Sequence, residues 1–248
     1  MRISPSCYAL VGLYFLPPWG VNAGFIVGKN TTLIVDTGAN YYSARTVYGY
    51  ARGVKEDNSF IAVNTEGHLD HLGGNSFFRD EGISVYGHSL IDREEREIGL
   101  QIEDFSAHVQ DRVRRESNEA AILFEKTRIT NPDIRISEDT ELDLGNKNVH
   151  IIMTPGHTTA NLSVYLPSEG VLFCGDCIVN RFIPNLGNGL GPEWQTWLKS
   201  LDRIEELSPE IIVPGHGDVL KGKKAVRDEI GRIRSVLAAA ISSGAAPT

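Results

Sequence analysis

The residues best suited to chemistry in this sequence are histidines and carboxylates that recur in short segments containing glycine or proline. Four of the seven histidines belong to three such segments. The set comprises His68, Asp70 and His71 in residues 64–74, His157 in residues 154–158, and His216 in residues 213–217. Each segment follows a short apolar run that is typical of a β-strand. Imidazole and carboxylate groups at strand ends can form a divalent metal site, because strands fix the backbone and turns let the side chains converge.

The spacing within residues 64–74 indicates two neighbouring metal positions. Asp70 and His71 are adjacent, so they cannot easily bind one ion together with His68. A further strand runs into a Gly-Asp turn at Asp176, between the second and third histidine segments. One histidine at a strand end is more often structural, but four in this arrangement with two aspartates favour a metal centre. The histidines that lack this context, which we expect to be structural, are His88, His108 and His150.

This pattern resembles the metallo-β-lactamase superfamily, whose signature is close to Thr-His-x-His-x-Asp-His-x-Gly-Gly. The matching positions, in family order, are Asp36-Thr37-Gly38, Thr65–Gly74, His157, Asp176 and His216. The resemblance implies an α+β fold, an αββα sandwich of two mixed β-sheets flanked by helices, with a dinuclear site at one edge of the sheets. The roles it implies are His68 and His157 on the first metal, Asp70, His71 and His216 on the second, Asp176 as the bridge and Asp36 orienting the site.

Glu66 stands where the superfamily usually has the first histidine of its signature. A carboxylate can bind zinc, so Glu66 would simply replace the imidazole. Its harder oxygen would also tilt the affinity toward iron or manganese. Alternatively, Glu66 turns away and leaves the first position weak. We therefore expect two Zn²⁺ ions, or one if Glu66 does not bind, with Fe or Mn as alternatives.

The resemblance implies a hydrolase in which a metal-bound hydroxide attacks the substrate and Asp70 orients the nucleophile and passes on a proton. Asp176 as the bridge is closer to glyoxalase II-like hydrolases than to secreted β-lactamases. We therefore expect a small-molecule ester, thioester, lactone or lactam as substrate. Asn180 and Arg181 follow Asp176 and are candidates to bind the substrate. The alternative interpretation of Arg181 is an ordinary surface arginine. Two other classes stay open: an iron-dependent oxidoreductase, and a catalytically weak metal-binding sensor or regulatory protein.

The composition is that of an ordinary globular protein, with 41% hydrophobic and 23% charged residues among 248. The net charge of −8 argues against a nucleic-acid partner, and no apolar run is long enough to span a membrane. Three cysteines do not make a disulfide framework. Cys174 and Cys177 form a Cys-x-x-Cys pattern, but Asp176 between them is assigned to the metals, so we expect no redox role.

The elements that must position these residues are short strands and amphipathic helices. Strands are expected at residues 8–15, 24–27, 32–35, 59–63, 83–86, 149–153, 161–166, 171–173 and 210–213. We interpret 8–15 as a strand rather than a secretory signal, because Pro17 and Pro18 end the run, and we expect a cytoplasmic protein. Apolar stripes predict helices around residues 194–207 and 226–237. Trp19 is a candidate for the rim of the site.

Residues 89–130 differ from the rest of the chain, being rich in charge with sparse apolar residues at roughly helical spacing. We expect one domain over residues 1–248, with 89–130 as a helical insertion. This insertion is either a pair of surface helices, a lid over the site, or a contact in a homodimer.

Overall fold

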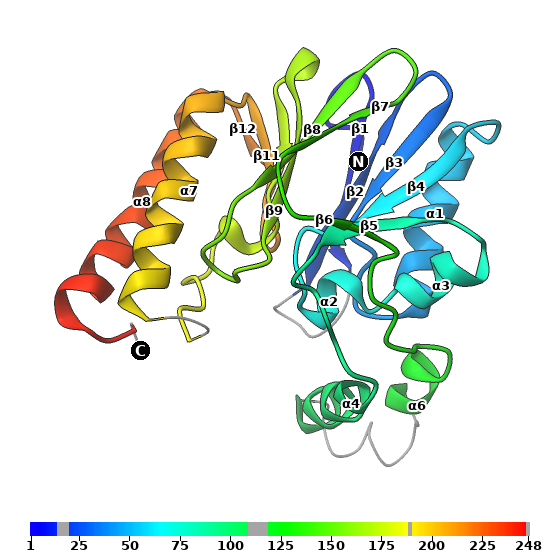
Figure 1. Ribbon diagram of the computed structural model, residues 1–248, viewed down its shortest axis with the longest axis horizontal. Coiled ribbons are helices and arrows are strands. Elements are labelled where there is room, and N and C mark those ends of the chain that lie inside the picture. Colours follow the sequence, from blue (N-terminus) through cyan, green and yellow to red (C-terminus); the bar gives the residue numbers. More distant parts are fainter. Residues whose placement is uncertain (14–19, 109–118, 188–189, 247–248) are drawn as a thin grey trace.

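The computed structural model contains two six-stranded β-sheets that pack face to face, with helices covering their outer faces (Figure 1). It describes residues 1–13, 20–108, 119–187 and 190–246. The predicted αββα sandwich of two mixed sheets is confirmed. Trp19, the candidate rim residue, lies outside the described residues.

The first sheet has the strand order β1-β2-β3-β4-β5-β6. Its strands are β1 (Cys7–Leu13), β2 (Val21–Val27), β3 (Thr31–Val35), β4 (Ser59–Val63), β5 (Val85–His88) and β6 (Ile134–Ile136). The first three pair antiparallel and the pairs from β3 to β6 are parallel. The helices α1 (Tyr41–Val54) and α3 (Asn75–Asp80) cover its outer face, where Phe25, Val47 and Phe78 are buried together.

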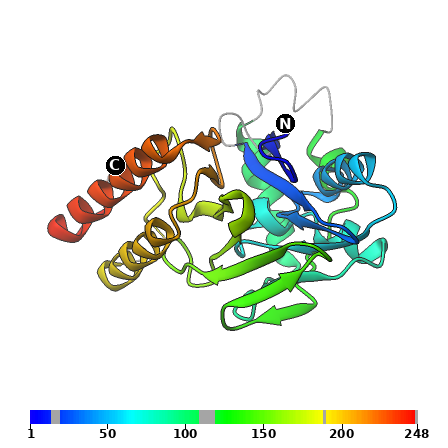
Figure 2. The same ribbon diagram turned by 90° about the horizontal axis from the view of Figure 1, so that it is seen from above.

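The second sheet has the order β12-β11-β10-β9-β8-β7. Its strands are β7 (Thr140–Asp143), β8 (Asn148–Met153), β9 (Leu162–Leu166), β10 (Val171–Phe173), β11 (Ile211–Val213) and β12 (Leu220–Lys221). Only β10 and β11 pair in parallel. The long helices α7 (Gly191–Leu207) and α8 (Lys223–Ser243) cover its outer face, where Trp197, Leu201 and Ile233 are buried. Seen from above, α8 and α1 lie on opposite sides of the molecule (Figure 2).

The space between the sheets is filled by apolar side chains from both inner faces. Leu33 and Val35 of β3 share one buried cluster with Ile151 of β8 and Val164 of β9. β8 and β10 are both antiparallel to β9, so they run in the same direction, and β11 is parallel to β10. The ends of β8, β10 and β11 therefore lie along one edge of the second sheet. The short helix α2 (Leu69–Leu72), which follows β4, lies near the sheet edges in Figure 1.

Helix α1 and the edge strands β6, β7 and β12 were not predicted from the sequence. The buried residues of α1 are mainly small: Ser43, Ala44, Val47 and Ala51. A capping box starts the helix: Asn40 Oδ1 accepts from Ser43 N, and Ser43 Oγ accepts from Asn40 N. The three edge strands have two to four residues each, which is too short for an alternating pattern to emerge.

The segment 89–130 contains α4 (Arg96–His108) and α6 (Glu119–Phe124), which contact each other and project beyond α2 and α3 (Figure 1). Arg128, at the end of the segment, forms an ion pair with Asp80 at the end of α3, with Nη2 3.0 Å from Oδ1. A role of the segment 89–130 as a lid or a dimer contact stays a prediction. Among the helices that the structure describes, none is long and apolar enough to cross a bilayer.

Glu169, in the 3₁₀ turn Pro167–Glu169 between β9 and β10, joins the N-terminal residues to the second sheet. Its carboxylate accepts hydrogen bonds from Ser4 Oγ, Ser6 N and Ser6 Oγ, and lies 3.3 Å from Lys147 Nζ. The Glu169 side chain is only 7% exposed. Burial alone would raise the pKa of Glu169, but these partners lower it below its usual value.

Candidate metal centre

The side chains singled out from the sequence all follow the ends of strands. Asp36 comes directly after β3 and is linked to the adjacent strand, since its backbone N–H donates to Val63 O at 2.9 Å. His68 is the N-cap of α2, after β4. The remaining positions are Asp70 and His71 in α2, His157 after β8, Asp176 in the 3₁₀ turn Gly175–Cys177 after β10, and His216 after β11.

One group of ligand atoms, which we call the Glu66 group, comprises Glu66, His68, His157 and Asp176. Its atoms lie within 4.8 Å of one another. Glu66 Oε2 is 2.7 Å from His68 Nδ1 and 3.8 Å from His157 Nε2. Asp176 Oδ2 is 3.5 Å from His157 Nε2. Glu66 is completely buried with its carboxylate in this group, so it does not turn away.

A second group, which we call the His216 group, comprises Asp70, His71 and His216. Asp70 Oδ2 is 3.2 Å from His216 Nε2 and 3.8 Å from His71 Nε2. Asp176 Oδ1 is 3.4 Å from the Nε2 atoms of both histidines. Asp176 therefore presents one carboxylate oxygen to each group, and the two groups share it.

Three of the imidazoles are oriented by a contact at Nδ1. The pairs are His71 with Asp36 Oδ2 at 3.0 Å, His157 with Asn185 O at 3.2 Å, and His216 with Gly20 O at 3.2 Å. Because ionised carboxylates and carbonyls only accept hydrogen bonds, Nδ1 carries the proton in each of these rings. The Nε2 atom of each ring then faces the carboxylates of the groups, and it is the atom that would bind a metal in place of a proton.

Asp36 is itself held tightly. Its carboxylate accepts from the backbone N and Oγ1 of Thr65, both at 2.7 Å, besides contacting His71. Its φ of 60° lies in the left-handed region, which costs a residue with a side chain on the order of 1–2 kcal/mol. Burial raises the pKa of Asp36, and the contacts with His71 and Thr65 partly offset that increase.

The electrostatics of the site come from closely packed opposite charges. Burial alone would lower the pKa of His68, but Glu66 raises it to about 9. Burial has the same effect on the pKa of His216, which Asp176 and Asp70 raise to about 11. Burial alone would raise the pKa values of Glu66 and Asp176, but the surrounding histidines hold both below the usual range.

The residues present fit a divalent metal. Among the described residues, two buried atoms that lie 3.4 Å apart make no hydrogen bond: His71 Nε2 and Asp176 Oδ1. Each such buried atom without a hydrogen bond costs about 1–3 kcal/mol, which a bound cation would offset. Four imidazoles and three carboxylates are also the donor types that zinc, iron and manganese accept.

Asn180 and Arg181 lie beside the His216 group. The backbone N of Asn180 donates to His216 O at 2.9 Å. The Arg181 guanidinium is exposed and pairs with Asp218, with Nη2 2.5 Å from Oδ2. Their contact with substrate stays a prediction, and Arg181 already has a carboxylate partner within the chain.

His88, His150 and the three cysteines lie outside both groups. His150 Nε2 is 3.4 Å from Glu141 on the exposed side of β8, and His88 Nδ1 accepts from Leu90 N. The side chain of His108 is not among those that the structure describes. Cys7, Cys174 and Cys177 are buried free thiols. Burial raises the pKa of Cys177 to about 12, which argues against a reactive thiolate.

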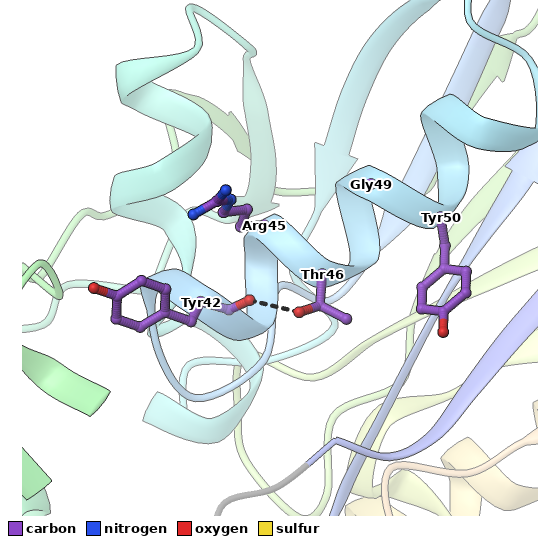
Figure 3. A pocket seen from close by; sticks show the side chains of 5 residues that line it. All are labelled: Tyr42, Arg45, Thr46, Gly49 and Tyr50. Atoms are coloured by element: carbon purple, nitrogen blue, oxygen red, sulfur yellow. Dashed lines mark hydrogen bonds between the residues drawn. The ribbon is translucent and has the colours of Figure 1, made fainter. Parts of the chain in front are cut away.

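A pocket of about 460 Å³ lies on the solvent-facing side of α1 (Figure 3). It is lined by Tyr42, Arg45, Thr46, Gly49 and Tyr50. None of these residues belongs to the Glu66 group or the His216 group, so this pocket is separate from the metal centre.

The sequence analysis did not identify the residues that hydrogen-bond to the backbone of His71 or leave space for Asp176. The carbonyl of His71 accepts from Thr37 N at 2.9 Å, Thr37 Oγ1 at 3.1 Å and Asn64 Nδ2 at 3.2 Å. Gly215 leaves space for Asp176, since a Cβ there would lie 1.9 Å from Asp176 Oδ1. Thr37 belongs to the matched segment Asp36-Thr37-Gly38, and Asn64 directly precedes the matched segment Thr65–Gly74. These positions were the available signal.

Comparisons with known proteins agree with this geometry. The family model described as "Metallo-beta-lactamase superfamily" matches residues 16–216. The chain belongs to the metallo-β-lactamase superfamily. This result confirms the resemblance that the sequence motifs indicated, with Glu66 as a member of the metal-ligand cluster.

Individual members of the superfamily are only distantly similar. The chain is 20% identical over 223 residues to the metallo-beta-lactamase type 2 of Bacteroides fragilis, covering 88% of this chain and 78% of that protein. It is 35% identical over 86 residues to a beta-lactamase-like protein 2 homolog of Drosophila melanogaster, covering 35% of this chain and 27% of that protein. A metallo-beta-lactamase structure from Pontibacter korlensis superposes with a TM-score of 0.69 at 19% identity, covering 96% and 97% of the two chains. The expected enzyme class, a hydrolase of the metallo-β-lactamase superfamily, is confirmed by the family match and by these homologues.

Proposed function

We propose that this protein is a metal-dependent hydrolase that cleaves a small-molecule ester, thioester, lactone or lactam. The observation that carries this proposal is the pair of ligand groups that share Asp176. Glu66, His68 and His157 would hold the first metal, and Asp70, His71 and His216 the second. Asp176 would bind both through its two oxygens.

Two divalent ions bound there would lower the pKa of water from 15.7 to about 7 and polarise the substrate carbonyl. The chain's own residues would orient the attacking water and transfer its proton. Asp70 Oδ2, which contacts His216 Nε2 at 3.2 Å, would orient the attacking water, take its proton and pass it to the leaving group. Asp36 would keep His71 in the tautomer that presents Nε2.

Zinc is the expected metal, and the donor set leaves a specific alternative. With three carboxylates instead of two in the ligand set, the site carries more hard oxygen, which favours iron or manganese. An iron-dependent oxidoreductase is therefore the second candidate function, and Glu66 is the residue that favours it. Visible absorption of iron-loaded protein under oxygen would distinguish it from a hydrolase.

The test of the hydrolase proposal is turnover after metal replacement. Purified protein is stripped with a chelator, refilled with zinc, manganese or iron, and assayed against a panel of esters, thioesters, lactones and lactams. We expect refilling to restore turnover. Because Asp70 is also a proposed metal ligand, Asp70→Asn is assayed with the metal at saturation, and we expect its kcat to be about 10²–10⁴-fold lower. His150→Ala, a histidine outside both groups, should keep full activity. A fully loaded protein that turns over nothing in the panel would instead support a metal-binding sensor.

Asn180 and Arg181 are the proposed substrate contacts. Arg181 would bind a substrate carboxylate bidentately, in exchange for its ion pair with Asp218. An Arg181→Lys variant should then raise KM for carboxylate-bearing substrates more than for neutral ones, because lysine lacks the planar fork.

A further inference from the structure

Arg232 of α8 forms hydrogen bonds with the loop that follows Asp176. Arg232 Nη2 donates to the carbonyls of Val179 and Phe182, both at 2.9 Å. These carbonyls lie on either side of Arg181, whose φ of 70° is in the left-handed region that residues other than glycine rarely adopt. One guanidinium therefore joins the two ends of a strained turn.

Glu229, one helical turn earlier on α8, keeps Arg232 in place. Arg232 Nε and Nη2 contact Glu229 Oε1 at 2.8 and 2.7 Å. The side chains of Glu229 and Arg232 are 11% and 35% exposed, so solvent screens this pair less than an exposed one. A planar guanidinium has enough donors in fixed directions to bind the carboxylate and both carbonyls at once.

The same turn is tied to the segment that carries His216. Asn180 N donates to His216 O at 2.9 Å, and Asn180 Oδ1 accepts from Asp218 N at 3.3 Å. Arg181 adds the ion pair with Asp218. Gly217 packs against the turn so closely that a Cβ there would lie 2.0 Å from Asn180 O. The turn 179–182 and the backbone around His216 therefore form one connected unit.

We infer that Arg232 is a positioning residue for the His216 group. It fixes the turn 179–182, and through that turn it fixes the backbone of His216. The inference rests on the proposed function only in requiring that the His216 group binds a metal. Loss of a residue that orients metal ligands typically costs 10–100-fold in metal affinity. Because Arg232 acts through a loop, we expect an effect near the lower end of that range.

The experiment measures metal release directly. Zinc-loaded wild type and Arg232→Gln are mixed with an excess of a chromophoric chelator, and the release of metal is followed by absorbance. We expect one release phase to be about tenfold faster in Arg232→Gln, with the other phase unchanged. Arg234→Gln is the matched control, because Arg234 lies on the same helix but pairs with Asp202 and Glu205 of α7.

A second variant distinguishes a loss of positioning from a folding defect. Arg232→Gln alone leaves Glu229 partly buried without its partner, so the double variant Glu229→Gln/Arg232→Gln is measured beside it, with circular dichroism as the check of folding. Equal release from wild type and a folded Arg232 variant overturns the inference. Equal acceleration in Arg234→Gln also overturns it, since that result would reflect general loosening of α8. Wild type that binds no metal would instead overturn the proposed function.

Discussion

The carboxylate of Asp36 and the imidazole of His71 form a buried pair beyond the ends of two neighbouring parallel strands. Asp36 Oδ2 lies 3.0 Å from His71 Nδ1, and the two side chains are at most 4% exposed. Asp36 follows β3, and His71 lies in α2, which follows β4. With its Nδ1 occupied, His71 presents Nε2 to Asp176 Oδ1 at 3.4 Å. Because the pairing of β3 with β4 fixes the position of Asp36, the contact with Asp36 also fixes the orientation of the His71 imidazole.

Replacing Asp36 with asparagine should weaken metal binding at the His216 group. The variant keeps the size of the side chain but removes the charge that holds the proton on His71 Nδ1. We expect affinity to fall by about 10–100-fold, measured by competition with a chelator of known affinity. Asp228→Asn, at an exposed ion pair with Lys224, is the control. Unchanged affinity in Asp36→Asn would show that the tautomer does not depend on this carboxylate.

Changing Glu66 should alter both the number and the kind of metal ions bound. In Glu66→Ala we expect metal content to fall from about two ions per chain toward about one, because the Glu66 group loses a ligand. Glu66→His should instead keep the content near two and shift selectivity from iron or manganese toward zinc. Plasma mass spectrometry of tag-free protein measures both. Identical metal content in wild type and Glu66→Ala would make Glu66 a bystander despite its position.

Glu169→Gln should lower stability in a pH-dependent way, independently of any metal. The folded-state pKa of Glu169 is lowered, so its charged hydrogen bonds stabilise the fold above the unfolded-state pKa. That contribution is lost as the pH falls through the folded-state pKa. At pH 7 we expect the variant to lose about 1–3 kcal/mol of unfolding free energy.

The measurement for Glu169 is urea unfolding of metal-free wild type and variant across acidic and neutral pH. The difference between the two proteins should shrink at acidic pH. Glu141→Gln on the exposed strand β7 serves as the control, with a change within about 0.5 kcal/mol. A difference that stays constant across the pH range would mean that the charge of Glu169 contributes nothing.

Cys174 and Cys177 should react only slowly with disulfide reagents in the folded protein. Burial raises the pKa of Cys174 well above its usual value and that of Cys177 to about 12. Thiolates react with disulfide reagents and thiols do not, so labelling at pH 8 should be slow in the native state and fast after unfolding. Rapid labelling of Cys174 or Cys177 in the native protein would restore the redox interpretation of the Cys-x-x-Cys pattern.

Much of the fold followed from local pattern. Most of the longer strands and the helices α7 and α8 lie where apolar runs and stripes predicted them. α1 was missed although Tyr41, Ala44, Val47, Tyr48 and Ala51 recur at helical spacing on one side, because several of its buried residues are small. It forms because its capping box starts the helix and the first sheet offers a surface on which Ala44 and Val47 pack. Tertiary packing, not propensity, decides such a helix.

The sequence by itself determined which residues meet at the site, since histidines and aspartates at strand ends converge once the strands share an edge. It did not determine how they meet. The proton positions depend on partners such as the Gly20 carbonyl, 196 residues from His216, and a backbone carbonyl has no signature in the sequence. The inward turn of Glu66 and the sharing of Asp176 likewise depend on how closely the two packed sheets bring their edges together. Those contacts join residues that are distant in the chain, and only the packed tertiary structure brings them within bonding distance.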